Sequence, residues 1–165
     1  MNNARNLMQT TTKNHLKVIA IPIESEIICL RGLSSERVRF ELEYALERGS
    51  TDNSFLFTNE KGSKKEQQSA VLVHPPGALY TEVFLASLTS FLPDSSINLK
   101  VVVGHVNPNR VKFLKQLKES YPNLELISSN PGAKLLQELW RQRKPHSKTS
   151  NQDNDSEEVS FPSIH

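Results

Sequence analysis

The corner between residues 99 and 110 constrains this chain most. Residues 99–103 form an apolar run of the kind that is buried on both faces of a sheet, and the run ends at Gly104 and His105. Pro108 then opens a helix near Asn109, because the fixed φ of proline suits the first helical turn. The pattern predicts a buried strand that leads through a tight turn into a helix, with His105 at the end of the strand.

Strand patterns dominate the first half of the chain. The predicted strands cover residues 16–23, 26–31, 38–44, 54–58 and 69–73, and the first two form a hairpin joined at Glu24 and Ser25. Pro22 suggests an edge position, because proline has no N–H to donate to a neighbouring strand. Residues 59–68 are polar and contain Gly62, so they are predicted to form a solvated loop.

The second half changes to helical spacing. Helices are predicted over residues 78–92, 110–120 and 131–143, the last of them starting at the cap Asn130, and strands are predicted at residues 99–103 and 124–128. A strand-rich half that leads into βαβα units is typical of an α/β (α+β) fold. Such a fold has a mixed sheet with helices on one face.

The two ends of the chain lack a periodic apolar face. Residues 1–15 are therefore predicted to be a disordered N-terminus, residues 16–143 the domain, and residues 144–165 a disordered tail. The first 17 residues contain Arg5, Lys13 and Lys17 and no acid, which faintly resembles a transit peptide. Disorder is the preferred interpretation of that segment.

The composition is typical of a soluble intracellular protein. The formal net charge is +2, and no apolar run approaches the roughly 18 residues needed to span a bilayer. Cys29 is the single cysteine, so it cannot form an internal disulfide and is expected to pack as a small apolar side chain. The sequence contains no glycine-rich phosphate loop and no Cys-x-x-Cys pair.

The corner resembles one found in metallo-β-lactamase-fold proteins. There the strand-to-helix corner reads His-x-His-x-Asp-His, and in the flavodiiron branch it reads His-x-Glu-x-Asp-His; the matching positions here are His105, Asn107, Asn109 and Arg110. Residues 33–53, 70–77 and 124–130 also resemble flavodiiron segments, and the likeness extends over residues 16–140. The chain most resembles cyanobacterial and plant flavodiiron-like proteins, whose corner is written His-x-Asn-Pro-Asn-Arg.

The resemblance implies a metallo-β-lactamase-like αββα sandwich, of which 165 residues supply about the N-terminal half. Intact relatives reduce oxygen or nitric oxide at a diiron centre fed by FMN. That chemistry is not expected here, because an amide is a poor metal ligand and a guanidinium cannot donate at all. His105 and, at the end of the preceding strand, His74 remain as weak metal ligands.

The leading hypothesis is a non-catalytic, metal-deficient protein related to the flavodiiron family, without a cofactor, produced by truncation or alternative splicing. The alternative is a metal-dependent hydrolase or oxidoreductase, using diiron or zinc, that a partner or a longer isoform completes. In either case the sheet should expose an apolar face, which a second copy or a partner would cover. The expected location is the chloroplast for a plant protein and the cytoplasm for a cyanobacterial one.

A nucleic-acid-binding module is a further alternative, because phosphate binding needs clustered cations. Two clusters occur: Arg110, Lys112, Lys115 and Lys118, and then Arg141, Arg143, Lys144 and Lys148. No aromatic residues are interleaved with them for base stacking, so a solvated helix face is the favoured interpretation.

Overall fold

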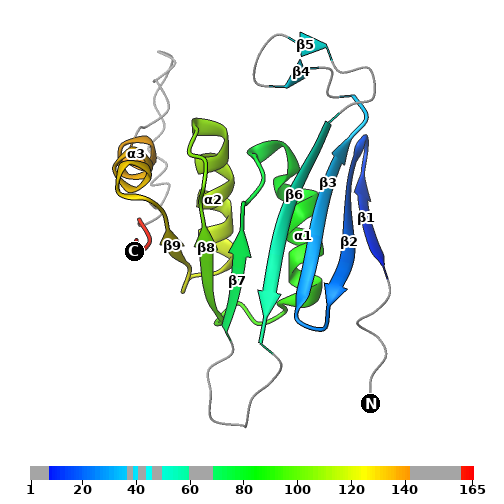
Figure 1. Cartoon of the computed structure of the whole chain (residues 1–165), viewed down its shortest axis with the longest axis horizontal. Helices are drawn as coiled ribbons and strands as arrows, with labels where there is room; N and C mark the ends of the chain where they lie inside the picture. The colour runs from blue at the N-terminus through cyan, green and yellow to red at the C-terminus, as the bar shows by residue number, and fades with distance from the viewer. Residues whose placement is uncertain (1–7, 37–38, 41–43, 46–49, 60–68, 142–160) are drawn as a thin grey trace, which may run out of the picture.

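A seven-stranded mixed sheet forms the centre of the computed structural model (Figure 1). The structure describes residues 8–36, 39–40, 44–45, 50–59, 69–141 and 161–165. The strand order is β1-β2-β3-β6-β7-β8-β9, so the strands of this sheet follow one another in space in the same order as in the chain. The mixed sheet predicted from the sequence is confirmed.

The first four strands of the sheet form an antiparallel meander. They are β1 (Gln9–Lys13), β2 (Leu16–Glu24), β3 (Ile27–Ser34) and β6 (Ser50–Thr58). β1 pairs with β2 only from Leu16 to Ala20, and the β2–β3 register shifts between Pro22 and Glu24. Pro22 therefore lies in an interior strand but beyond the reach of β1, where its missing N–H costs no hydrogen bond.

The last three strands are parallel to one another. β7 (Ser69–Val73), β8 (Asn98–Val102) and β9 (Glu125–Ile127) are joined through helices, as the sequence predicts. The helical elements are η2 (Ala78–Tyr80), α1 (Thr81–Phe91), α2 (Pro108–Ser120) and, after β9, α3 (Asn130–Arg141). Figure 1 shows α1 and α2 on the same face of the sheet, which is the arrangement that right-handed crossovers produce.

The core lies between this face and the two helices. Leu30, Leu56 and Leu72 point from three neighbouring strands toward the helices and are fully buried. On the helix side, the rings of Phe84 and Phe113 meet edge to face with their centroids 5.4 Å apart, so α1 and α2 contact each other directly.

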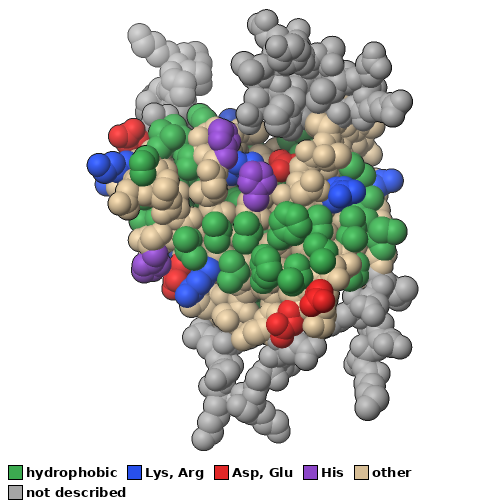
Figure 2. Space-filling view, viewed as in Figure 1, with side chains coloured by type: hydrophobic (Ala, Val, Ile, Leu, Met, Phe, Trp, Pro, Cys, Tyr) green, Lys and Arg blue, Asp and Glu red, His purple; other side chains and the backbone are tan. Residues whose placement is uncertain are grey.

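The opposite face of the sheet, here called the outer face, carries an apolar band. One register row crosses six strands and consists entirely of apolar side chains: Ile21, Cys29, Phe55, Val73, Val102 and Ile127. Phe57, in the next row, remains 39% exposed, and Ile23 54%. Figure 2 shows the band across the middle of this face. Cys29 is buried within it, as expected for a small apolar side chain.

Two predictions about the chain ends need correction. Disorder predicted for residues 1–15 does not hold for β1, because this strand pairs along its whole length with β2, and an ion pair between Lys13 and Glu82 also joins it to α1. Disorder predicted for residues 144–165 does not hold for Phe161–His165, which pair with β9. Residues 1–7 and 142–160 lie outside the described part of the chain.

A third correction concerns residues 38–44, where one strand is predicted. The structure has two short strands instead, β4 (Arg39–Phe40) and β5 (Tyr44–Ala45), which pair antiparallel with each other. The alternating polar and apolar residues of this segment therefore form a small sheet of their own and do not join the main sheet. Of the loop predicted at residues 59–68, residues 60–68 lie outside the described part of the chain. Within the described part, no helix has the length and apolarity needed to cross a membrane.

Candidate functional site

The candidate site lies where β7 and β8 end side by side. Val73 pairs with Val102, and the His74 N–H donates to the Val102 carbonyl at 3.0 Å. His74 therefore follows β7 immediately, and His105 follows β8 by three residues. The sequence predicts this placement, because parallel strands bring their carboxyl ends to one edge of the sheet.

The backbone of His74 is in the left-handed region, with φ of 59°. This conformation is uncommon for a residue with a Cβ atom, although histidine tolerates it better than most residues do. Besides the N–H bond to Val102, the His74 carbonyl accepts a hydrogen bond from Ser54 Oγ at 2.8 Å. Neighbouring strands thus hold the turn on both sides of the residue.

The start of α2 is capped by Asn107. Its backbone is extended, and its Oδ1 accepts a hydrogen bond from the Arg110 N–H at 2.8 Å. Pro108 follows within the first turn, where a missing N–H leaves no helical bond unmade. The Asn107 side chain is therefore engaged in ending the turn and starting the helix.

Arg110 turns inward and is only 7% exposed. Its Nη1 donates to the carbonyl of His105 at 2.9 Å. Charged side chains are seldom this buried unless they are hydrogen-bonded, so this contact fixes both the guanidinium and the turn that carries His105. Asn109 is exposed and lies against the turn after β7, where a Cβ added to Gly77 would be 2.7 Å from Asn109 Nδ2.

Burial and neighbouring charges disfavour the protonated form of His74. Partial burial lowers the pKa of His74 below its ordinary value of 6.5, the Arg110 guanidinium lowers it further, Asp52 raises it and His105 lowers it. The unfolded chain therefore takes up this proton at a higher pH than the folded chain. The contribution of His74 to the free energy of unfolding should therefore decrease as the pH falls through 6.5 and below.

Comparison with known proteins agrees with the family resemblance found in the sequence. No family model matches the chain. It is 40% identical over 116 residues to diflavin flavoprotein A 6 of Nostoc sp. (strain PCC 7120), a match that covers 70% of this chain and 19% of the relative. It is 36% identical over 118 residues to diflavin flavoprotein A 3 of Synechocystis sp. (strain PCC 6803), covering 72% of this chain and 18% of that one.

This chain is a flavodiiron homologue. The metal-soaked Flv1 flavodiiron core from Synechocystis sp. PCC6803 superposes with a TM-score of 0.67 and 33% identity, covering 90% of this chain and 31% of that one. Fragment 1–254 of diflavin flavoprotein A 5 from Nostoc sp. PCC 7120 gives a TM-score of 0.62 and 32% identity, covering 74% and 45%. The chain spans about a fifth of the length of the curated relatives it matches.

A diiron centre does not fit the residues at this corner of the flavodiiron homologue. His105 is close enough to His74 to contribute to the lowering of the His74 pKa, but Asn107 and Arg110 are engaged in backbone hydrogen bonds. Across the part of the chain that the structure describes, no group of three or more His, Cys, Asp or Glu side chains is placed to hold a metal ion. Two imidazoles alone form a weak transition-metal site.

The sequence did not single out Ser54, Asp52 or Gly77 as parts of the corner. Ser54 and Asp52 come from β6, which reaches the site only through its pairing with β7 and β3. A surface hollow of about 390 Å³ lies at the opposite end of β8 and β9, beside Asn98, and so cannot serve His74 or His105. The corner is the better candidate site, because His74, His105 and Arg110 lie close to one another there.

Three of the four basic residues of α2 contact other groups of the protein, and Lys112 is exposed. Arg110 is buried, the Lys115 ammonium donates to the Trp140 carbonyl at 2.7 Å, and the Lys118 ammonium lies on the carbonyls of Pro122 and Leu124. Among the predicted cations, Arg143, Lys144 and Lys148 lie outside the described residues.

Replacing Asn107 by alanine should lower the free energy of unfolding by about 1 kcal/mol, because the helix loses its cap. Asn107→Asp keeps an acceptor oxygen and adds a charge that the helix N-terminus favours, so it serves as the matched control and should retain most of the stability. Thermal and denaturant unfolding of the two variants measure the difference. A melting temperature of Asn107→Ala equal to that of the unmodified chain would contradict the role given to the cap.

Proposed function

We propose that this flavodiiron homologue is a non-catalytic member of its lineage, in which hydrogen bonds within the protein hold the corner that metal ligands hold in the flavodiiron branch with the His-x-Glu-x-Asp-His motif. The observation that carries the proposal is the double engagement of the corner: Asn107 caps α2, and Arg110 binds the His105 carbonyl. Neither side chain offers an anionic donor, and a guanidinium beside two imidazoles repels a cation.

Metal content tests this proposal. The purified chain, loaded with excess Fe(II) or Zn(II) and desalted, should retain well under two metal ions per chain and should show no oxygen reduction. His74 and His105 would be the ligands of any Fe(II) or Zn(II) that is retained. Two tightly bound metal ions per chain, measured by elemental analysis, would overturn the proposal.

Restoring ligand-type residues separates the substitutions from the rest of the site. The triple variant Asn107→Glu, Asn109→Asp and Arg110→His carries the flavodiiron residues at the corner. It should still fail to bind two metal ions, because the described part of the chain contributes no second group of donors. A dinuclear site in this variant would show that the three positions alone abolish metal binding.

We also propose that the outer face is covered by self-association. The band from Ile21 to Ile127 crosses six strands and lies on the face opposite to α1 and α2 (Figures 1 and 2). A continuous apolar surface of this kind favours association over solvation. Placing charges on this face should therefore dissociate the oligomer.

A further inference from the structure

The segment Phe161–His165 lies along the outer edge of β9, where its last three residues make backbone contacts with that strand. Two backbone N–H groups of the β9 region point outward, and both are satisfied: the Leu126 N–H donates to the Ser163 carbonyl at 2.8 Å, and the Ser128 N–H to the His165 carbonyl at 3.1 Å. The His165 N–H donates back to Leu126 at 2.9 Å. The bridge between Leu126 and Ile164 is parallel, like the pairing of β8 with β9.

Side chains anchor this segment against α3. The ring of Phe161 meets Trp140 edge to face, with centroids 5.3 Å apart and an interplanar angle of 89°. Pro162 is buried, and Ile164 packs against the core. Trp140 is itself only 6% exposed, and its other neighbour is the Lys115 ammonium, 5.7 Å from the ring centroid.

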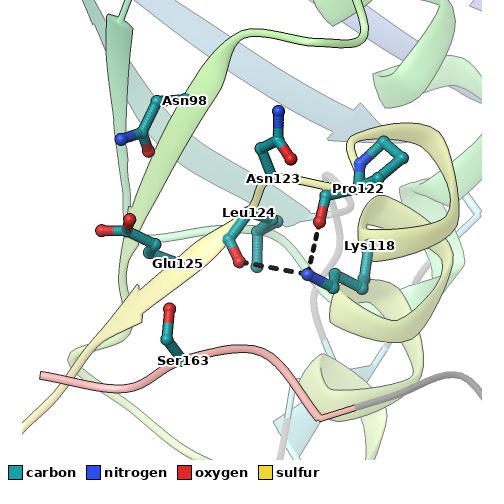
Figure 3. A pocket seen from close by; sticks show the side chains of 7 residues that line it. All are labelled: Asn98, Lys118, Pro122, Asn123, Leu124, Glu125 and Ser163. Carbon is teal, nitrogen blue, oxygen red and sulfur yellow. Dashed lines mark hydrogen bonds between the residues drawn. The ribbon is translucent and has the colours of Figure 1, made fainter.

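The middle of the segment makes its contact through the backbone alone. The Ser163 side chain is exposed and lies at the rim of the polar hollow described above, opposite Lys118 and near Glu125 (Figure 3). Recognition therefore combines main-chain hydrogen bonds with apolar anchors on both sides of Ser163, and main-chain pairing at a sheet edge is a mode by which proteins bind extended peptides.

We propose that the β9 edge, with Trp140 and Leu126, is a peptide-binding groove whose resident ligand is the chain's own segment Phe161–His165. The groove selects an extended peptide that runs parallel to β9, with an aromatic side chain for Trp140 and an aliphatic one three residues later. Residues 142–160 separate α3 from this ligand in the sequence. Docking is therefore intramolecular, and the resident segment outcompetes the same peptide supplied free in solution.

Trp140 is the only tryptophan in the chain, so its fluorescence reports whether the groove is occupied. In the full-length chain, Phe161→Ala should shift Trp140 emission to longer wavelength. Ser163→Ala is the matched control, since its backbone contact remains, and it should leave the emission unchanged. A synthetic Phe-Pro-Ser-Ile-His peptide should then reverse the shift in Phe161→Ala and bind that variant roughly tenfold more tightly than it binds the unmodified chain.

Amide hydrogen exchange gives a second readout that is independent of fluorescence. The N–H groups of Leu126 and Ser128 should exchange faster in Phe161→Ala, whereas the Val103 N–H, which donates to Ile127 inside the sheet, should stay protected and show that the fold is intact. Equal emission and equal exchange in Phe161→Ala and Ser163→Ala would overturn the proposal. So would failure of the free peptide to bind the Phe161→Ala chain.

Discussion

Replacing Phe113 by alanine is expected to lower the free energy of unfolding by about 3–5 kcal/mol. The side chain is fully buried in α2 and meets Phe84 of α1 edge to face, so the substitution leaves a cavity between both helices and the sheet. The loss is a large fraction of the stability of a domain of this size. Chemical denaturation followed by circular dichroism measures it.

Phe57→Ala is the matched control, because it removes the same side chain from the outer face. Phe57 is 39% exposed in the single chain, so its removal should cost less than about 1 kcal/mol when measured at low protein concentration. Equal losses for the two variants would mean that the outer face is as well packed as the helix face. The core would then not be confined to the space between the sheet and the helices α1 and α2.

The second large effect concerns association. The unmodified chain should be oligomeric and should bind hydrophobic dyes, whereas the double variant Phe57→Lys and Val71→Lys should be monomeric. These two residues are register partners on the outer face, and paired like charges there oppose the stacking of one copy on another. Analytical ultracentrifugation and dye fluorescence report the change.

Leu79→Lys with Leu135→Lys forms the matched control for this experiment. Both leucines are exposed, at 41% and 40%, and both lie on helical elements rather than on the sheet. The control adds the same charge and should leave the oligomer intact. A monomeric, dye-free unmodified chain with a sharp cooperative melt would show that the outer face needs no cover.

Local patterns predicted the elements that have strong periodicity. The helices around Phe84 and Phe113 and the parallel strands were found because their apolar spacing repeats over many residues. β1 was missed although Thr10–Thr12 are β-branched, since the turn that joins it to β2 contains no glycine. Asn14 supplies the left-handed conformation there, with φ of 52°, and asparagine is the residue after glycine most suited to it.

Contacts between distant segments were beyond the reach of such patterns. Phe161 and Ile164 are isolated apolar residues in a polar tail, and only the Trp140 ring and the β9 edge, both formed elsewhere, give them a partner. At the corner, the predicted strands end within a residue of β7 and β8, so the sequence located His74 and His105 at this edge, and their role as metal ligands stays a prediction. The burial of Arg110 could not be read from the sequence, because an arginine in the first turn of a helix is ordinarily solvated.

The strand order has a consequence for how this chain folds. Every strand of the main sheet pairs with the strand of that sheet that comes before it, from β1 to β9, and Phe161–His165 continue the series by pairing with β9. No strand has to wait for a distant segment, so the sheet can grow in one direction as the chain leaves the ribosome. Each newly formed edge on the side away from β1 is the template for the next strand, whereas the outer edge of β1 pairs with no described strand.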